Sequence, residues 1–210
     1  MDKTPPWVVT THDWAAAVDE EHLAHIRKNA DRYARGGLRH MMLEVLAYAD
    51  DEAAATDRVG TVVIATRSDG SVSIRDDGRG TDIRRTPQGH IIRKPVMATR
   101  DIRFFDNPDR PVLPDGLPRW GMSVVAALST TLIHENRRAT GGWTQTYRHG
   151  VPATELVEVT GDGTTGTTVT FTLQSAPDTN YTVRPSDQSA FTSLQFSLGT
   201  VQDRRMGSSE

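Results

Sequence analysis

Residues 37–53, GLRHMMLEVLAYADDEA, constrain the fold of this chain more than any other stretch. Apolar side chains recur there at spacings of three and four, which predicts one helix with a buried stripe made of Leu38, Met41, Met42, Val45, Leu46 and Ala49. Glu44, Tyr48 and Asp51 follow one another at spacings of four and three, so they share a second face beside that stripe. A carboxylate so placed is either solvated at the helix edge or held in a pocket.

Composition excludes several classes of protein and site. The chain has 210 residues, a net charge of −3 and no cysteine, so disulfides, thiolate metal sites and a cysteine nucleophile are excluded. Its seven histidines, His40 among them, lack metal-ligand spacing and are expected to be structural or exposed, so we expect no metal site. The near-neutral charge gives no signature of direct DNA binding. Without a membrane-length apolar run or a signal-peptide layout, the expected location is cytoplasmic.

Spacing and turn residues predict the remaining elements. An extended lead-in at 1–12 and a short helix at 13–17 precede a helix at 19–33 and a hairpin of 61–66 with 71–76. A long loop, 81–116, is expected to contain a short helix at 96–100. A helix at 122–130 and four strands follow, at 131–137, 143–149, 154–160 and 166–173. This order predicts an α+β fold with helices on one face of a mixed, mostly antiparallel sheet.

The expected organisation is one domain with two flanking segments. Residues 1–18 are expected to form an N-terminal extension, 19–175 the domain, and 176–210 a polar C-terminal tail. Four apolar residues of the tail could pack back onto the domain: Phe191, Leu194, Phe196 and Leu198.

Six motifs occur in a telling order: IRKNADRYARGGLRHM at 26–41, LEVLAYADDEA at 43–53, SVSIRDDGRG at 71–80, WGMSVVAALS at 120–129, YRHGVP at 147–152 and GTTVTF at 166–171. Together they resemble the N-terminal ATPase domain of the gyrase B and topoisomerase IV type, in the GHKL or Bergerat-fold superfamily. The resemblance implies a two-layer sandwich and covers residues 26–173. Because the chain's length accommodates this domain alone, we expect a stand-alone member.

The resemblance also implies roles for individual residues. Glu44 matches the general base that activates the attacking water, and Asp77 the carboxylate that takes the adenine amino group. Gly80 is one of the glycines beside that carboxylate, where the absence of a side chain lets the ligand approach closely. Arg79 matches an arginine that pairs with an acidic residue of the helix, here Glu52; a supporting salt bridge is an equal alternative to ligand contact.

Two further positions match the family's pocket. Thr167 matches the threonine beside the adenine contact, and Arg138 matches an arginine at the pocket mouth.

Departures from the family pattern alter what the site is expected to bind. Tyr48 stands where the family has a magnesium-binding asparagine, and a phenol is a poor neutral ligand for Mg²⁺. In the family, the loop that covers ATP, called the lid, has a glycine-rich end whose backbone N–H groups bind phosphate. In this chain that end reads DGLPRWG, where Pro118 removes an N–H donor, while Arg119 and Trp120 add bulk. These changes mark a degenerate member, and we expect no cofactor, with Mg–ATP disfavoured.

Three hypotheses for the function remain open. The first is a pocket repurposed for a small organic ligand, with metal-free acid/base isomerisation, cyclisation or elimination by Glu44, Asp77 and Tyr48, as in specialised metabolism. Arg79, Gly80, Arg119, Trp120, Arg138 and Thr167 would then contact the ligand. The second is a decoy that binds gyrase-targeting antibiotics, which use the positions matched by Asp77, Arg79 and Arg138. The third is a residual ATP-binding module acting with a partner. The oligomeric state is left open.

Overall fold

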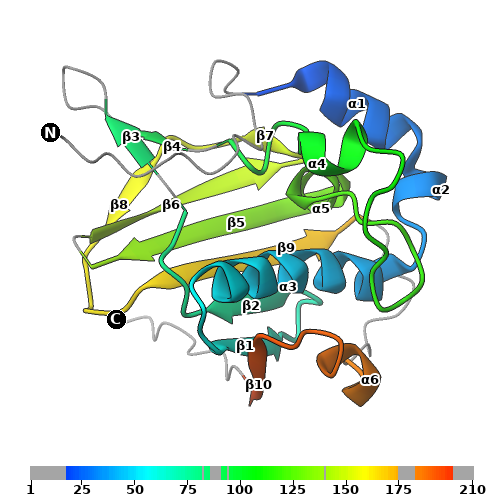
Figure 1. Cartoon of the computed structure of the whole chain (residues 1–210). Coiled ribbons are helices and arrows are strands. Elements are labelled where there is room, and N and C mark those ends of the chain that lie inside the picture. The colour runs from blue at the N-terminus through cyan, green and yellow to red at the C-terminus, as the bar shows by residue number, and fades with distance from the viewer. Residues whose placement is uncertain are drawn as a thin grey trace, which may run out of the picture.

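A computed structural model of the chain describes residues 18–81, 83–85, 91–93, 95–139, 141–174 and 183–200 (Figure 1). The side chains of 83–85, 91–93 and 198–200 are not among those described. The expectations for the lead-in at 1–12 and the helix at 13–17 also fall outside the described residues.

Eight strands form the main sheet, in the order β10-β1-β2-β9-β5-β6-β7, with β8 paired to β6 off this path. Their bounds are β1 Gly60–Thr66, β2 Val72–Asp76, β5 Ser129–Arg138, β6 Gly141–Arg148, β7 Val151–Pro152, β8 Val157–Val159, β9 Gly166–Leu173 and β10 Leu194–Thr200. All pairs are antiparallel except β1 with β10. Two short strands, β3 Ile83–Arg85 and β4 Ile91–Arg93, pair separately.

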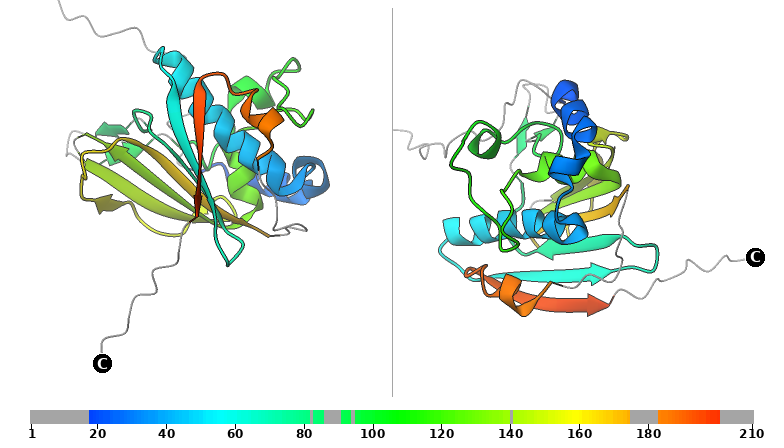
Figure 2. Two further views of the ribbon diagram at one scale, coloured as in Figure 1. Left: turned by 90° about the horizontal axis from the view of Figure 1, so that it is seen from below. Right: turned by 90° about the vertical axis from the view of Figure 1, so that its right-hand side faces the viewer.

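The helices gather on one face of this sheet, as two views at right angles show (Figure 2). They are α1 Glu20–Lys28, α2 Ala30–Tyr33, α3 Gly37–Ala55, α4 Ile102–Phe105, α5 Met122–Leu128 and α6 Pro185–Gln188. The α+β architecture and the mixed, mostly antiparallel sheet predicted from the sequence are therefore confirmed. No helix in the described part of the chain is long and apolar enough to cross a membrane.

Helix α3 forms the centre of the helical layer, as its periodicity predicts. It begins after Gly36, whose φ of 90° is a left-handed conformation that glycine adopts without strain. The whole predicted stripe is buried, and Met41, Met42 and Leu46 are completely inaccessible to solvent. They belong to one core with apolar side chains of the sheet, including Ile74 and Phe171. Glu44 is also completely buried, so it does not lie at a wet helix edge.

The loop before α5 differs from the prediction. The expected helix at 96–100 is wrong: the backbone makes a turn there, with the N–H groups of Ala98 and Thr99 both donating to the carbonyl of Pro95. The helix comes later, as α4, because the Asp101 side chain caps it by accepting from the N–H of Arg103 at 3.0 Å.

The C-terminal segment completes the sheet. Its alternating apolar residues favour a strand, and β10 adds to the outer edge of β1. Phe191 is 5% exposed, and Leu194 and Phe196 pack partly buried against the core, as expected. The expectation for Leu198 concerns a side chain outside the described set. The strand predicted at 154–160 is shorter, Val157–Val159, and β7 precedes it.

Replacement of Phe191 by alanine tests how firmly this segment holds the domain together. Phe191→Ala is expected to lower the free energy of unfolding by about 3 kcal/mol, because it leaves a cavity beneath the segment that leads into β10. Urea denaturation measures the change. Val157→Ala, at a position 55% exposed, is the control and should change stability by less than about 0.5 kcal/mol. Equal, small effects of the two substitutions would mean that the segment is only loosely attached.

Candidate ligand site

Glu44 is bound to the backbone at the start of α5. Its Oε1 accepts a hydrogen bond from the N–H of Trp120 at 2.6 Å, and its Oε2 accepts from the N–H of Gly121 at 2.9 Å. These are charge-assisted bonds to backbone donors that precede a helix, where a carboxylate is favoured. Both oxygens of the expected general base therefore serve the protein's own backbone. The expectation that Glu44 faces a ligand, partly desolvated, does not match this placement.

His40 joins Glu44 to the loop before α5. Its Nδ1 lies 2.8 Å from Oδ2 of Asp115, and its Nε2 lies 3.4 Å from Oε1 of Glu44. Burial alone would lower the pKa of His40, but the hydrogen bonds to Asp115 and Glu44 outweigh it and raise this pKa to about 9. His40 is therefore an imidazolium at neutral pH that bridges two carboxylates, and its role is structural.

Tyr48 belongs to a second set of contacts that holds the loop against α3. Its hydroxyl donates to Oδ2 of the buried Asp101 at 2.7 Å, and Asp101 also accepts from Arg103 at 2.6 Å. Burial, together with the Asp101 charge, raises the pKa of the Tyr48 hydroxyl well above its usual range. We call this set the lid cluster, and its members are Tyr48, Asp51, Asp101, Arg103, Phe104 and Arg119.

Arg119 completes the lid cluster instead of facing an open site. Its guanidinium lies 4.9 Å from the ring centre of Tyr48 and 4.4 Å from that of Phe104, and it pairs with Asp51 at 2.8 Å. Such stacking of a guanidinium on aromatic rings is a favourable cation–π contact. Arg119 is 6% exposed, and its Nε has no hydrogen-bond partner among the described residues.

Trp120 points to a different region from Tyr48. Its indole packs edge-on against Tyr33, with ring centres 5.0 Å apart, and lies 5.5 Å from the ring of Phe105. Tyr48 and Trp120, the two aromatic departures from the family pattern, therefore do not line the same space. Tyr48 packs against Phe104, while Trp120 packs toward α2.

The residues at this end do not fit the Mg²⁺ and phosphate groups that the fold family implies. The phenol of Tyr48 is committed to Asp101, and a Cβ on Gly121 would lie 3.0 Å from its oxygen, so the space is filled. The N–H groups of Trp120 and Gly121 are taken by Glu44. Within the described residues, no group of three or more histidine or carboxylate side chains is arranged to hold a metal ion.

Asp76, and not Asp77, faces the helical layer. Because successive side chains alternate along a strand, Asp76 shares the face of the buried Ile74, two residues earlier on β2. Its Oδ1 accepts from the N–H groups of Gly78 at 2.8 Å and Thr167 at 3.2 Å. Within the described residues, its Oδ2 accepts no hydrogen bond. The alternation of β2 was the signal that could have identified Asp76 from the sequence.

Asp77 lies on the other side of the chain, which corrects its expected position beside Thr167. Its Oδ1 accepts from the N–H of Thr61 at 2.9 Å, and its Oδ2 pairs with Arg58 at 2.7 Å. Its side chain is 44% exposed. Glu44, Asp77 and Tyr48, the three residues expected to be catalytic, therefore each bind a different part of the protein.

Arg79 forms the supporting salt bridge that was one of its two expected roles. Its Nε and terminal nitrogen donate to the two oxygens of Glu52 at 2.6 and 3.0 Å, and its N–H donates to the same carboxylate at 3.3 Å. Such a bidentate pair fixes the loop after β2 against the end of α3. The Arg79 side chain is 64% exposed.

Gly80 and Arg138 lie together at the end of β5. Gly80 has a φ of 81°, and a Cβ there would lie 2.5 Å from Oδ1 of Asn136, so the close approach requires glycine. Asn136 accepts from the N–H of Thr81 at 2.6 Å, and Arg138 donates to the carbonyl of Thr81 at 3.3 Å. The sequence did not single out Asn136.

Four polar residues lie together on adjacent strands, next to Gly80 in the loop after β2. Thr167 of β9 pairs in register with Asn136 of β5, and its other neighbour is Asp76 at the end of β2. Arg138 lies two residues beyond Asn136, on the same face. We call this group the Asp76 cluster, and it consists of Asp76, Gly80, Asn136, Arg138 and Thr167.

The Asp76 carboxyl has an unusual acidity. Burial is the main cause that raises its pKa to about 6, and the nearby charges of Glu52 and Asp77 raise it further. The two hydrogen bonds from the backbone act in the opposite direction and lower the pKa. A carboxyl of this kind is stabilised by a further donor at its free oxygen.

Known proteins resemble the chain in both sequence and fold, although no family model matches it. It is 32% identical over 166 residues to DNA gyrase B of Streptomyces coelicolor, covering 77% of this chain and 24% of that protein. It is 31% identical over 169 residues to the novobiocin-sensitive DNA gyrase B of Streptomyces niveus, covering 78% and 25%. The chain thus spans about a quarter of the length of these relatives.

A solved structure shows the same fold. The ATP-binding domain of Francisella tularensis topoisomerase IV, in complex with a small-molecule inhibitor, superposes with a TM-score of 0.58 at 20% identity. The match covers 85% of this chain and 50% of that one.

The pH dependence of stability tests the charge of His40. Its pKa is about 9 in the folded chain and about 6.5 when unfolded, so its contribution is complete below pH 6.5 and is lost as pH rises to 9. We expect the free energy of unfolding to fall by about 2–3 kcal/mol over this range. In His40→Gln this fall should disappear, whereas His25→Gln, at an exposed position, should retain it. Chemical denaturation at several pH values measures both slopes, and equal slopes in wild type and His40→Gln would refute the assignment.

Asp76→Asn is expected to stabilise the domain at pH 7. Because the folded pKa of about 6 exceeds the unfolded value of about 3.8, ionisation of Asp76 costs stability as pH rises between these values, and the cost persists above pH 6. An amide removes this cost and keeps the acceptor for Gly78 and Thr167. The expected gain is about 1–2 kcal/mol in chemical denaturation. Asp77→Asn, at the exposed neighbour, is the control, and a destabilising Asp76→Asn would contradict the prediction.

Proposed function

The chain belongs to the gyrase B type of GHKL ATPase domains, and from this premise we propose that it binds a small organic molecule at the Asp76 cluster without hydrolysing Mg–ATP. The observation that supports this most directly is the Asp76 carboxyl. It is half-buried, with one oxygen bound to the backbone and the other without a donor among the described residues. A half-buried carboxyl oxygen takes a hydrogen bond from water or from a ligand, so a ligand N–H or O–H is favoured there.

The contacts of Tyr48 and Glu44 support the proposal that the chain does not hydrolyse Mg–ATP. The lid cluster fills the region where the family resemblance implies a metal ion. Glu44 would have to give up two short hydrogen bonds and its contact with His40 before it could activate a water. Each such bond contributes about 1.5–3 kcal/mol when one partner is charged, so release of Glu44 is costly. For the same reason we propose that the chain binds its ligand and does not convert it by acid/base chemistry at Glu44.

Inhibitors of gyrase-type domains are the ligand class that the comparisons favour. The Streptomyces niveus relative is named for its sensitivity to novobiocin, and the Francisella tularensis domain holds a small-molecule inhibitor. Asp76 binds the backbone of Gly78 and Thr167 and no member of the lid cluster, and a ligand there needs neither a metal ion nor phosphate contacts. A domain that binds such a compound without turnover would lower its free concentration and act as a decoy.

Novobiocin binding tests this proposal. Isothermal titration calorimetry of the full chain should show saturable binding, and Asp76→Asn should weaken it at least tenfold, because loss of a buried charged acceptor costs about 1.5–3 kcal/mol. Asp77→Asn should leave the affinity unchanged. Since Asp76→Asn is expected to be the more stable protein, weaker binding cannot be attributed to unfolding.

Three outcomes would overturn the proposal. Equal losses in Asp76→Asn and Asp77→Asn, or no binding by the wild type, would exclude an inhibitor held by Asp76. Turnover of Mg–ATP that Glu44→Gln abolishes would show that Glu44 is released from the backbone and that the chain is an ATPase.

A further inference from the structure

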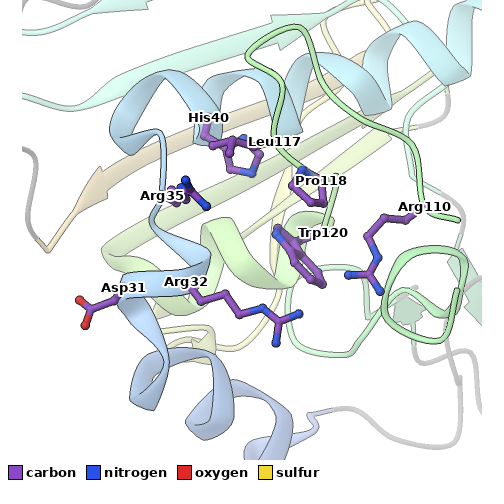
Figure 3. A pocket seen from close by; sticks show the side chains of 8 residues that line it. All are labelled: Asp31, Arg32, Arg35, His40, Arg110, Leu117, Pro118 and Trp120. Carbon is purple, nitrogen blue, oxygen red and sulfur yellow. The ribbon is translucent and has the colours of Figure 1, made fainter. Parts of the chain in front are cut away.

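A separate cavity of about 460 Å³ lies between α2, the start of α3 and the loop before α5 (Figure 3). Its walls include Arg32, Arg35, His40, Arg110, Pro118 and Trp120. A second cavity of about 520 Å³ adjoins it, because both are lined by Arg32, Arg110 and Trp120. Neither shares a residue with the Asp76 cluster. Volumes of this size are typical of small-molecule sites.

Three guanidinium groups give the first cavity an excess of positive charge. Arg32 and Arg35 form no ion pair with any carboxylate in the part of the chain that the structure describes. Arg110 uses its Nε to donate to the carbonyl of Asn107 at 3.0 Å, and its terminal nitrogens donate to none of the described residues. Asp31 also belongs to the wall, but its carboxylate points away from Trp120 in Figure 3. The charge of His40 is balanced by Asp115 and Glu44.

Trp120 holds two of these guanidinium groups in place. The Cζ of Arg32 lies 5.0 Å, and that of Arg110 4.3 Å, from the centre of the indole, which stands between the two side chains in Figure 3. The backbone of Trp120 is fixed in turn by its hydrogen bond to Glu44 at 2.6 Å. Guanidinium groups stacked on a buried ring lose less freedom when they bind an anion, because they are already ordered.

We propose that this cavity binds a phosphate monoester or a diphosphate. The planar fork of a guanidinium group binds two oxygens of a phosphate group at once, and three cations that line one cavity favour an anion of at least two charges over a single carboxylate. The site is independent of the proposed function: it lies against α2 and uses none of the residues that would hold an organic ligand at the Asp76 cluster.

Calorimetric titration with pyrophosphate, with phenyl phosphate and with benzoate tests the proposal. The full chain should bind the first two saturably and benzoate far more weakly, with affinities that fall as salt is added. Arg35→Gln should weaken phosphate binding about five- to tenfold, and it should leave the fold intact because Arg35 makes no hydrogen bond or ion pair with the described residues. The triple variant Arg32→Gln, Arg35→Gln, Arg110→Gln should lose binding. Arg148→Gln removes the same charge from an exposed position on β6 and should have no effect.

Three outcomes would overturn this inference. Equal effects of Arg35→Gln and Arg148→Gln would indicate unspecific attraction to positive charge. Loss of pyrophosphate binding in Asp76→Asn would place the anion at the Asp76 cluster. Absence of saturable binding of pyrophosphate and phenyl phosphate by the wild-type chain would exclude the site. Because Asp76→Asn should weaken novobiocin binding but not phosphate binding, the two proposals fail independently.

Discussion

The carboxylate of Glu44 has to be neutralised inside the protein, and much of the helical layer is arranged around this requirement. A buried, unpaired carboxylate costs several kcal/mol, so it needs donors on every side. Two backbone N–H groups and one imidazolium supply them, within 3.4 Å. The three partners come from the start of α5 and from α3, and His40 extends the network to Asp115 in the preceding loop. A single charge thereby fixes the middle of α3, the loop and α5 with respect to one another.

The surroundings of Tyr48 and of Asp76 differ in how their polar groups are paired. Near Tyr48, Arg103 pairs with Asp101 and Arg119 pairs with Asp51, and aromatic rings pack against both guanidinium groups. Donors at the start of a helix attract anions in general, and here the protein supplies its own anion in Glu44. Near Asp76, by contrast, the carboxyl is half-buried, and only one of its oxygens has partners among the described residues. Polar capacity left unmet in this way is more characteristic of a binding surface than of a packing contact.

The sequence predicted the fold well and the site less completely, for identifiable reasons. Helix α3 and the β1–β2 hairpin follow from local periodicity and turn residues, which do not depend on distant parts of the chain. The hydrogen bonds of Glu44 could not be predicted, because Trp120 lies far away in the sequence and a backbone N–H carries no signature of side-chain type. The hydrogen bond of Tyr48 could not be predicted either, because its partner Asp101 lies in a loop without periodicity. Asp76 and Asp77 are adjacent and chemically identical, and the family match was made to Asp77 although the alternation of β2 places Asp76 on the face of Ile74.

The parallel pairing of β10 with β1 affects the order in which the domain can assemble. Gly60 lies beside Leu194, so the outer edge of β1 stays uncovered until residues near the C-terminal end of the described chain have been synthesised. Pairing of strands so distant in sequence is slow, because a large loop must close before any contact is gained. During that interval β1 presents unpaired N–H and C=O groups to other chains, which favours aggregation through this edge. Production of this domain should therefore depend on prompt completion of the chain as much as on the stability of the finished fold.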